Sequence, residues 1–391
     1  MGKMYFSVSE YKERLAKTKE SMEENNIEVL LITNPGNICY LTGYDAWSFY
    51  VHQMLIVSLD KKDPVWFGRG IDVDAVKFTT WLNDEDIIAY PDDYVQSDTK
   101  HPMDYMCKVL KDMKVDNKTI GMEFDSYYFT AQCYISLTKG LPNAEIKNGQ
   151  GIVNWVKIIK SEKEIEYMRR AGIITAKAMQ AGIDALAPGV RQSDVVADIN
   201  YISTKGTKEF GGDYPGHPPL LPSGEQTSAC HMTWTDDLLV QGEPSIIELG
   251  GCYRRYNVPM ARTVSLGEPS DKLKKLSDVC VEGIDEALSV VKPGITSEDV
   301  EKAWRKSIEK HGFKKESRIG YSIGLNFPPS WGEETVSIRP GDKTILEENM
   351  TLHMIPGMWL DGVGMEISQS FVVTKHGFEE LGDIPRKLFV K

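Results

Sequence analysis

The feature that most constrains the fold is a weak internal repeat. Residues 182–203, GIDALAPGVRQSDVVADINYIS, resemble residues 283–308, GIDEALSVVKPGITSEDVEKAWRKSI. Each copy reads as the end of a long helix, a Pro-Gly stop, an aspartate (Asp194 or Asp299) and a second helix, followed by strand-rich sequence. Two copies are too few for a solenoid. The repeat predicts an α+β domain with pseudo-two-fold duplicated halves around a central cleft; the alternative is chance, because helices that end in Pro-Gly are common.

A different pattern precedes the repeat. Short apolar runs typical of buried strands alternate with helical sequence up to about residue 155, which predicts an α/β domain. The expected strands cover 27–33, 54–59, 64–68 and 86–91, and the expected helices lie at 9–26 and within 123–141. A long helical pattern at 158–189 then opens the duplicated part. We therefore expect domains at residues 1–157 and 158–391.

Composition excludes several classes of function. The chain has 391 residues and a net charge of −12, which disfavours binding to nucleic acid or to an anionic membrane surface. No apolar run approaches the roughly 20 residues of a membrane helix. The six cysteines form no CxxC pair, and the N-terminal stretch MGKMYFSVSEYKERL lacks the apolar core of a signal peptide. We expect a cytoplasmic protein with reduced thiols and neither a membrane nor a nucleic-acid partner.

One carboxylate stands out in the stretch 245–264, SIIELGGCYRRYNVPMARTV, which reads as two strands around a Gly250-Gly251 turn. Glu248 sits in the first strand between Ile247 and Leu249, where alternation alone does not explain a charged residue. A buried carboxylate is costly without a partner, so Glu248 is expected to face one or to have a chemical role.

Five landmarks along the second domain resemble the pita-bread family, which includes methionine aminopeptidase, prolidase and creatinase. They are LLPSGEQTSACH (220–231), IELGGCYRRYNVPMARTV (247–264), GYSIG (320–324), HMIPG (353–357) and GMEISQSFVVT (364–374). The resemblance covers the whole chain, because prolidases and creatinase also carry a smaller N-terminal α/β domain. It implies a pita-bread catalytic domain, and a homodimer in which the N-terminal domain of one subunit lies near the cleft of its partner.

The family's metal ligands are mostly missing. Metal-dependent members use Asp, Asp, His, Glu and Glu, and the matching positions here are Glu248, Pro259, Tyr321, Ile355 and Glu366. Proline and isoleucine have no side-chain donor, and tyrosine is an uncommon ligand. We expect neither a dinuclear metal site nor another cofactor; the alternative is a single ion on Glu248, Glu366 and His231.

Four further strings resemble the metal-free, ectoine-hydrolase branch of this family: GYDAWSFYVHQ (43–53), VWFGRGIDVDAVKFTTWL (65–82), HPPLLPSGEQTSACHMTW (217–234) and PPSWGEETVSIRPGD (328–342). The resemblance implies metal-independent hydrolysis of a cyclic amidine. The substrate would be a small zwitterion such as ectoine, opened to an N-acetylated diaminobutyrate. The alternatives are a creatinase-like guanidine hydrolase, a catalytically dead module that binds peptides, and a residual metallopeptidase.

The chemistry of the matched positions fits such a substrate. Without a metal, Glu248 and Glu366 would repel each other, and a planar amidinium between them removes the conflict. We expect Glu248 to act as nucleophile or as base for water, and Glu366 to bind a ring N–H and shuttle protons. By family position, His231 would transfer protons to the departing nitrogen, and the Tyr321 hydroxyl would stabilise developing charge.

Further residues are candidates for substrate binding. Trp47, Phe49 and Tyr50 could stack on a planar cation, with ordinary packing as the alternative. His217 lies in a polar loop, where it is a site candidate or a simple turn residue. Arg262 could hold the substrate carboxylate, or it could brace the strand pair; the other candidate is Arg339, which is otherwise a loop arginine.

Overall fold

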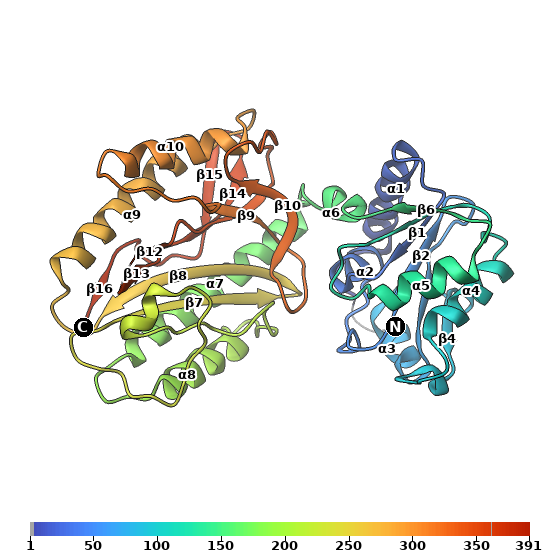
Figure 1. Cartoon of the computed structure of the whole chain (residues 1–391), viewed down its shortest axis with the longest axis horizontal. Coiled ribbons are helices and arrows are strands. Elements are labelled where there is room, and N and C mark those ends of the chain that lie inside the picture. Colours follow the sequence, from blue (N-terminus) through green and yellow to red (C-terminus); the bar gives the residue numbers. More distant parts are fainter. Residues whose placement is uncertain (1–3, 361) are drawn as a thin grey trace. The chain divides into compact units, whose positions relative to one another are not determined.

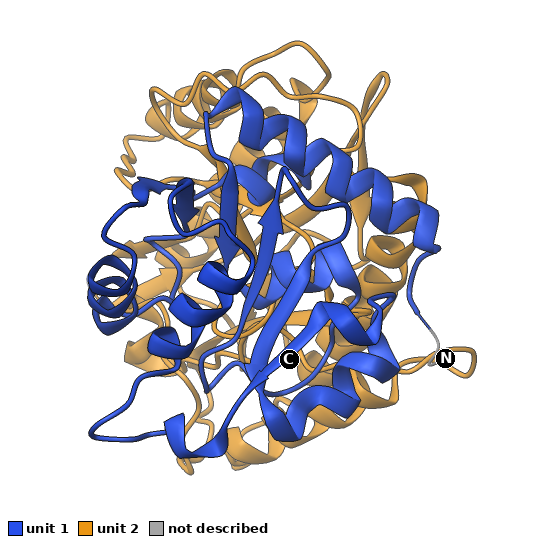
Figure 2. Cartoon of the chain, turned by 90° about the vertical axis from the view of Figure 1, so that its right-hand side faces the viewer, with its two compact units in different colours: residues 1–157 blue, residues 158–391 orange. Residues whose placement is uncertain are grey.

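The computed structural model describes residues 4–360 and 362–391, so the first residues of the N-terminal stretch lie outside it. The chain divides into two compact units, Met1–Lys157 and Ile158–Lys391 (Figure 2). None of the described helices is long and apolar enough to cross a bilayer.

The first unit is built on a six-stranded mixed sheet with the order β4-β3-β2-β1-β5-β6 (Figure 1). Its strands are β1 (Val29–Ile32), β2 (Met54–Ser58), β3 (Val65–Arg69), β4 (Ile87–Tyr90), β5 (Thr119–Met122) and β6 (Glu145–Asn148). Its helices are α1 (Val8–Glu24), α2 (Pro35–Thr42), α3 (Val73–Thr79), α4 (Pro102–Asp112), α5 (Ala131–Gly140) and α6 (Ile152–Val156). This arrangement confirms the α/β class expected for the N-terminal part.

The position of strand β1 between two hydrophobic cores explains why its sequence is apolar throughout. Val29 and Leu31 belong to the hydrophobic core that includes α4 and α5, whereas Leu30 and Ile32 belong to the core that includes α1 and α2. Successive side chains of a strand point to opposite faces of its sheet. Helices therefore cover both faces of the sheet, and both faces exclude water.

The second unit repeats one pattern twice, which confirms the duplication. Its first half contains α7 (Glu162–Ala185), α8 (Gln192–Lys205), β7 (Pro244–Tyr253) and β8 (Tyr256–Ser265). Its second half contains α9 (Asp271–Ser289), α10 (Ser297–Glu309), β9 (Gly320–Ile323), β10 (Gly332–Ile338), β11 (Thr351–Met354), β12 (Met358–Leu360), β13 (Val363–Met365), β14 (Gln369–Thr374) and β15 (Gly377–Leu381), and β16 (Phe389–Val390) returns to β8. Each half packs its two helices on its own strands around a separate hydrophobic core.

The two aspartates of the repeat have related structural roles. The Asp299 carboxylate accepts from the Thr296 hydroxyl at 2.7 Å and from its backbone N–H, which completes a capping box at the start of α10. Asp194 pairs instead with Arg191, at the start of α8, at 2.6 Å. Both carboxylates sit in the first turn of a helix, where negative charge is stabilised by the helix dipole.

The hairpin of β7 and β8 turns at a different place from the one expected. Arg254 and Arg255 form the turn with φ angles of 54° and 67°, while Gly250 and Gly251 lie inside β7. These glycines are required by close packing. A Cβ atom at Gly250 would lie 3.0 Å from the Trp331 ring, and one at Gly251 would lie 2.5 Å from the backbone of α7. The hairpin can thus approach its neighbours on both sides.

We expect the ion pair between Lys160 and Glu333 to be essential for stability. Their Nζ and Oε2 atoms lie 2.5 Å apart, and the two side chains are 0% and 1% exposed. Lys160→Met removes a charged partner of a carboxylate that stays buried, so the free energy of unfolding should fall by about 3–5 kcal/mol. Urea unfolding followed by circular dichroism measures the change.

The matched control is Lys163→Met, whose partner Glu166 is 39% exposed and whose loss should cost at most about 1 kcal/mol. Equal unfolding midpoints for the two variants would contradict a dominant role for the buried pair.

Candidate active site

Two glutamates from the two halves of the second unit come together beside β8. Glu248 lies in β7, opposite Ala261 of β8. Glu366 follows β13, and its backbone is held by Thr263 of β8. The Thr263 hydroxyl accepts the Glu366 N–H at 2.9 Å and donates to its carbonyl at 2.9 Å. These contacts fix Glu366 two residues along β8 from the residue that pairs with Glu248.

Burial sets the protonation of this carboxyl pair, defined here as Glu248 and Glu366. Each side chain is 5% exposed. Burial and then the charge of Glu366 hold the pKa of Glu248 well above its ordinary value. Burial raises the pKa of Glu366 to about 7, although the nearby Lys315 ammonium lowers it. No hydrogen bond to either carboxyl group is found among the described residues. The pair therefore holds a proton and lacks donors from the protein.

A chain of neutral polar groups lies next to the carboxyl pair. The Trp331 indole N–H donates to the Tyr321 hydroxyl at 2.8 Å, and that oxygen lies 3.3 Å from Nδ1 of His353. Nε2 of His353 lies 2.8 Å from the Ser368 hydroxyl, which also accepts the Ala261 N–H at 2.7 Å. The chain connects β9, β11 and β8, so it ties the strands of both halves together.

Both titratable members of this chain are neutral at physiological pH. Burial, and then the charge of Glu248, raise the pKa of Tyr321 above its ordinary value. Burial lowers the pKa of His353 to about 3, with smaller contributions from His217 and Arg262. Tyr321 therefore keeps a proton that it can donate, and His353 keeps a lone pair that can accept one.

The structure separates the two candidate histidines. His217 stacks on Trp331 with ring centroids 3.4 Å apart, its Nδ1 lies 2.9 Å from the Pro218 carbonyl, and burial lowers its pKa. This stacking places His217 next to the hydrogen-bonded chain that contains Trp331 and Tyr321, although the residue lies in a loop. His231 is exposed, with a left-handed φ of 64°. Its charge lowers the pKa of His217, which places the two rings within electrostatic range.

The geometry of Arg262 favours the bracing role over the role in substrate binding. Its side chain is 0% exposed. Its guanidinium donates to the carbonyls of Ser368, Ile384 and Pro385 at 2.5–2.9 Å. Burial lowers its pKa to about 9. Because backbone carbonyls occupy these donors, Arg262 fastens the C-terminal segment to β8 and does not present its charge to a substrate.

Lys315 is a cation of the site that sequence reasoning missed. It lies in the loop between α10 and β9. Its Nζ donates to the Gly357 carbonyl at 2.5 Å and sits 4.4 Å from the Trp359 ring centroid. A Cβ atom added at Gly357 would lie 3.1 Å from Oε1 of Glu366, so the segment around Gly357 passes next to the carboxyl pair. Burial lowers the pKa of Lys315 to about 8, opposed by the charge of Glu366. The charged string FKKESR gives no periodic signal that would single this lysine out.

The three aromatic candidates belong to the first unit. Trp47 and Tyr50 are 58% and 64% exposed. Phe49 packs against Trp47 and Tyr128, with ring centroids 4.7 and 5.8 Å apart. Their contact with a substrate, like the homodimer that would bring it about, stays a prediction.

The donor set does not fit the dinuclear metal centre of metal-dependent relatives. Pro259 and Ile355 offer no side-chain donor, and the Tyr321 oxygen already holds the Trp331 N–H. Only two carboxyl groups remain, and the pKa of each is raised. Among the described residues, the side chains that are grouped closely enough to bind an ion are His52, His101 and Cys133, in the first unit.

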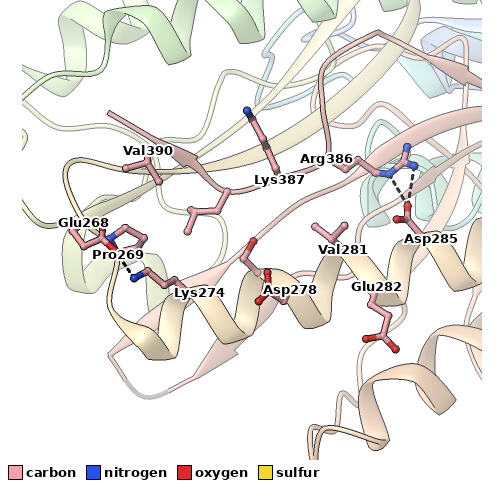
Figure 3. A pocket seen from close by; sticks show the side chains of 12 residues that line it. Glu268, Pro269, Lys274, Asp278, Val281, Glu282, Asp285, Arg386, Lys387 and Val390 are labelled. Carbon is pink, nitrogen blue, oxygen red and sulfur yellow. Dashed lines mark hydrogen bonds and ion pairs between the residues drawn. The ribbon is translucent and has the colours of Figure 1, made fainter.

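A cavity of about 580 Å³ lies away from the carboxyl pair in the second unit, between α9 and the C-terminal segment (Figure 3). None of the candidate residues lines it. Its charges are largely paired: Arg386 with Asp285 at 2.8 Å, and Lys274 with Glu268. None of the acids that line this cavity is buried, so the cavity holds no counterpart of the carboxyl pair.

We expect Glu366 to make the fold less stable as the pH rises. In the folded chain Glu366 keeps its proton up to about pH 7, whereas in the unfolded chain it releases the proton near its ordinary pKa of 4.5. The folded state therefore binds more protons between these values, and rising pH should remove up to roughly 3 kcal/mol of unfolding free energy. Glu366→Gln should flatten this dependence in urea unfolding at about pH 5 and about pH 8. The exposed Glu225→Gln should keep the wild-type slope, and identical slopes for all three proteins would refute the assignment.

Comparison with known proteins places the chain in a family. Residues 166–375 match the profile of metallopeptidase family M24, and residues 14–159 match the Creatinase/Prolidase N-terminal domain. The chain is 42% identical to the ectoine hydrolase of Halomonas elongata over 99% of this chain and 98% of that one. It is 45% identical to the uncharacterized hydrolase/peptidase y4tM of Sinorhizobium fredii, over 99% of each chain. The prolidase of Thermococcus sibiricus shares the fold, with a TM-score of 0.84 at 21% identity over 97% of this chain and 99% of that one. The chain therefore belongs to metallopeptidase family M24, with a pita-bread C-terminal domain behind a Creatinase/Prolidase N-terminal domain.

Proposed function

We propose that this protein is a hydrolase that opens the cyclic amidine ring of ectoine to N-acetylated diaminobutyrate without a metal ion. One observation carries the proposal: the buried carboxyl pair has raised pKa values and no hydrogen-bond donor among the described residues. Such a pair is suited to a ligand that brings both positive charge and N–H donors. The 42% identity to an ectoine hydrolase supports the same substrate class.

An amidinium meets both requirements of the carboxyl pair. It is planar and positively charged, and its ring N–H groups can each donate to one carboxylate. Opposite charge lowers the pKa of a carboxyl group, so substrate binding favours loss of the proton that the free pair holds. Glu248 would thus become ionised when the substrate arrives, which is the state that attack requires.

The reaction adds water across one C–N bond. Glu248 either takes a proton from the attacking water or adds to the amidinium carbon itself, and the carbon becomes tetrahedral. When water attacks, a carbonyl forms at this carbon while its bond to one ring nitrogen breaks. When Glu248 adds first, the C–N bond breaks, and water then adds to the same carbon and releases the Glu248 carboxylate as the carbonyl forms. The departing nitrogen takes up a proton and leaves as an ammonium group. Amidinium and water thus become an amide and an ammonium, and the net charge is unchanged.

Three side chains would handle the protons of this reaction. Glu366, with a pKa of about 7, can accept and return a proton near neutral pH. Tyr321 retains its hydroxyl proton and can donate it to charge that develops on the tetrahedral carbon's substituents. His231 keeps its proposed role as donor to the departing nitrogen, and its exposed position would require it to move toward the carboxyl pair.

Lys315 completes the electrostatic match to a zwitterion. Ectoine carries a carboxylate beside its amidinium, and Lys315 is a partly buried ammonium within electrostatic range of Glu366. We propose that Lys315 binds the substrate carboxylate beside the Trp359 ring, while the carboxyl pair binds the amidinium. Arg262 is unsuited to this role because its donors are used by backbone carbonyls.

The first test is turnover of ectoine, hydroxyectoine and creatine by the purified chain, with metal content measured and with a chelator present. We expect an N-acetylated diaminobutyrate from ectoine, at the same rate with chelator. Glu248→Gln should lower kcat by about 10²–10⁴-fold, because it removes the base or nucleophile. Exposed Glu225→Gln is the matched control and should keep full activity.

Each other outcome rejects the proposal in a distinct way. Product from creatine but not from ectoine would indicate the guanidine-hydrolase alternative. Loss of turnover with chelator and its return with a transition metal would indicate a metallopeptidase-like centre. No product from any of these compounds would favour a module that only binds its ligand.

The second test addresses Lys315. Lys315→Met should lower kcat/KM for ectoine by about 10–100-fold, the value of a hydrogen bond to a charged group. It should leave kcat/KM nearly unchanged for the same cyclic amidine without the carboxylate. Lys314→Met, at the exposed neighbouring position, is the control. Equal losses of kcat/KM for both substrates would show that Lys315 does not bind the substrate carboxylate.

A further inference from the structure

A second group of reactive side chains lies in the first unit. His52 precedes β2, His101 is the N-cap of α4, and Cys133 lies in the first turn of α5. One ligand atom from each of the three side chains lies within 4.8 Å of the others. The positions are 49 and 32 residues apart in the sequence, so no short metal-binding motif announces them.

One pair of these side chains already has the spacing of two ligands on one zinc ion. Sγ of Cys133 lies 3.5 Å from Nδ1 of His52. Zinc binds sulfur at about 2.3 Å and imidazole nitrogen at about 2.0–2.1 Å in tetrahedral geometry, which places the two donors roughly 3.5 Å apart. The rings of His52 and His101 have centroids 4.7 Å apart. The ligand atom of His101 lies within 4.8 Å of the other two, so its ring would have to shift toward them to share the ion.

The protein holds the two imidazoles in the state that binds a metal ion. Burial lowers the pKa of His52 to about 4 and also lowers that of His101, so both imidazoles are neutral and have lone pairs. Burial raises the pKa of the Cys133 thiol. Zinc would replace the thiol proton, so each ion that binds would release one proton. The His52 backbone is braced, because the Tyr90 hydroxyl donates to its carbonyl at 2.9 Å.

Besides the contact between Cys133 and His52, binding would cost a hydrogen bond at the start of α4. Nδ1 of the His101 ring accepts the backbone N–H of Met103 at 3.2 Å, and the Asp104 carboxylate accepts the backbone N–H of His101 at 3.0 Å. An ion bound through Nδ1 would replace the first of these bonds and leave the second intact. One helix-capping bond is weak compared with zinc binding to a thiolate and two imidazoles.

A cavity gives the group an open side. It has a volume of about 140 Å³ and is lined by both histidines together with Tyr50, Ser97 and Lys100. This space is large enough for several water molecules. A three-ligand zinc ion keeps its fourth position for water or another small ligand, and here that position would face the cavity.

We propose that His52, His101 and Cys133 bind one zinc-type divalent ion, with a fourth coordination position open to the cavity of the first unit. This site is separate from the carboxyl pair, and it does not depend on the function proposed for that pair. The alternative is a simple thiol–imidazole hydrogen bond between Cys133 and His52.

Cobalt replaces zinc in such sites and reports sulfur ligation by a near-ultraviolet charge-transfer band. The experiment titrates Co²⁺ into the full chain after metal removal. We expect one equivalent to bind with this band, and zinc to displace it. Cys133→Ser should abolish the band, whereas Cys230→Ser, at the exposed cysteine of the second unit, should keep it.

Two further variants keep the result interpretable. His101→Asn retains an N-cap residue, so it should fold normally and yet weaken Co²⁺ binding at least 10-fold. Glu248→Gln should leave the band and the affinity unchanged. No stoichiometric binding, a band that persists in Cys133→Ser, or binding that is lost in Glu248→Gln would each overturn the proposal.

Discussion

The mutual repulsion of two buried carboxyl groups is the constraint on which the site depends. Glu248 and Glu366 are each 5% exposed, and no protein donor among the described residues relieves them. Water would stabilise their charges far better than this environment does, so the free protein keeps a proton on the pair. The strands that hold them in place, above all β8 with Thr263, must therefore be stable enough to resist this repulsion.

The duplicated architecture explains how such a site can form. One glutamate comes from each half, and the chain from Trp331 through Tyr321 and His353 to Ser368 joins the strands of both. The halves have separate hydrophobic cores, so each is packed independently of the polar groups between them. In metal-dependent relatives a cation stabilises the acids at this place. Here the remaining donors do not fit two ions, and we propose an organic cation as the ligand of the pair.

Much of this arrangement could be predicted from local sequence. Short apolar runs located strands β1 to β4 of the first unit but not β5 and β6, and the Pro-Gly stops located the paired helices of the second unit. Aliphatic neighbours singled out Glu248, and the resemblance of the landmark strings to the family singled out Glu366. The turn of the hairpin was misplaced at Gly250-Gly251, since glycine also serves close packing, and Trp331 and α7 are distant in sequence.

The sequence by itself determined the class of each domain, the duplication and the two acids, because these follow from periodicity and from residue type at matched positions. Only the tertiary structure decided that Arg262 is used by backbone carbonyls, that Lys315 lies within electrostatic range of Glu366, and that Cys133 meets His52. The physical reason is that hydrogen bonds and pKa values depend on neighbours within a few ångströms. Those neighbours come from segments whose separation along the chain carries no periodic signal.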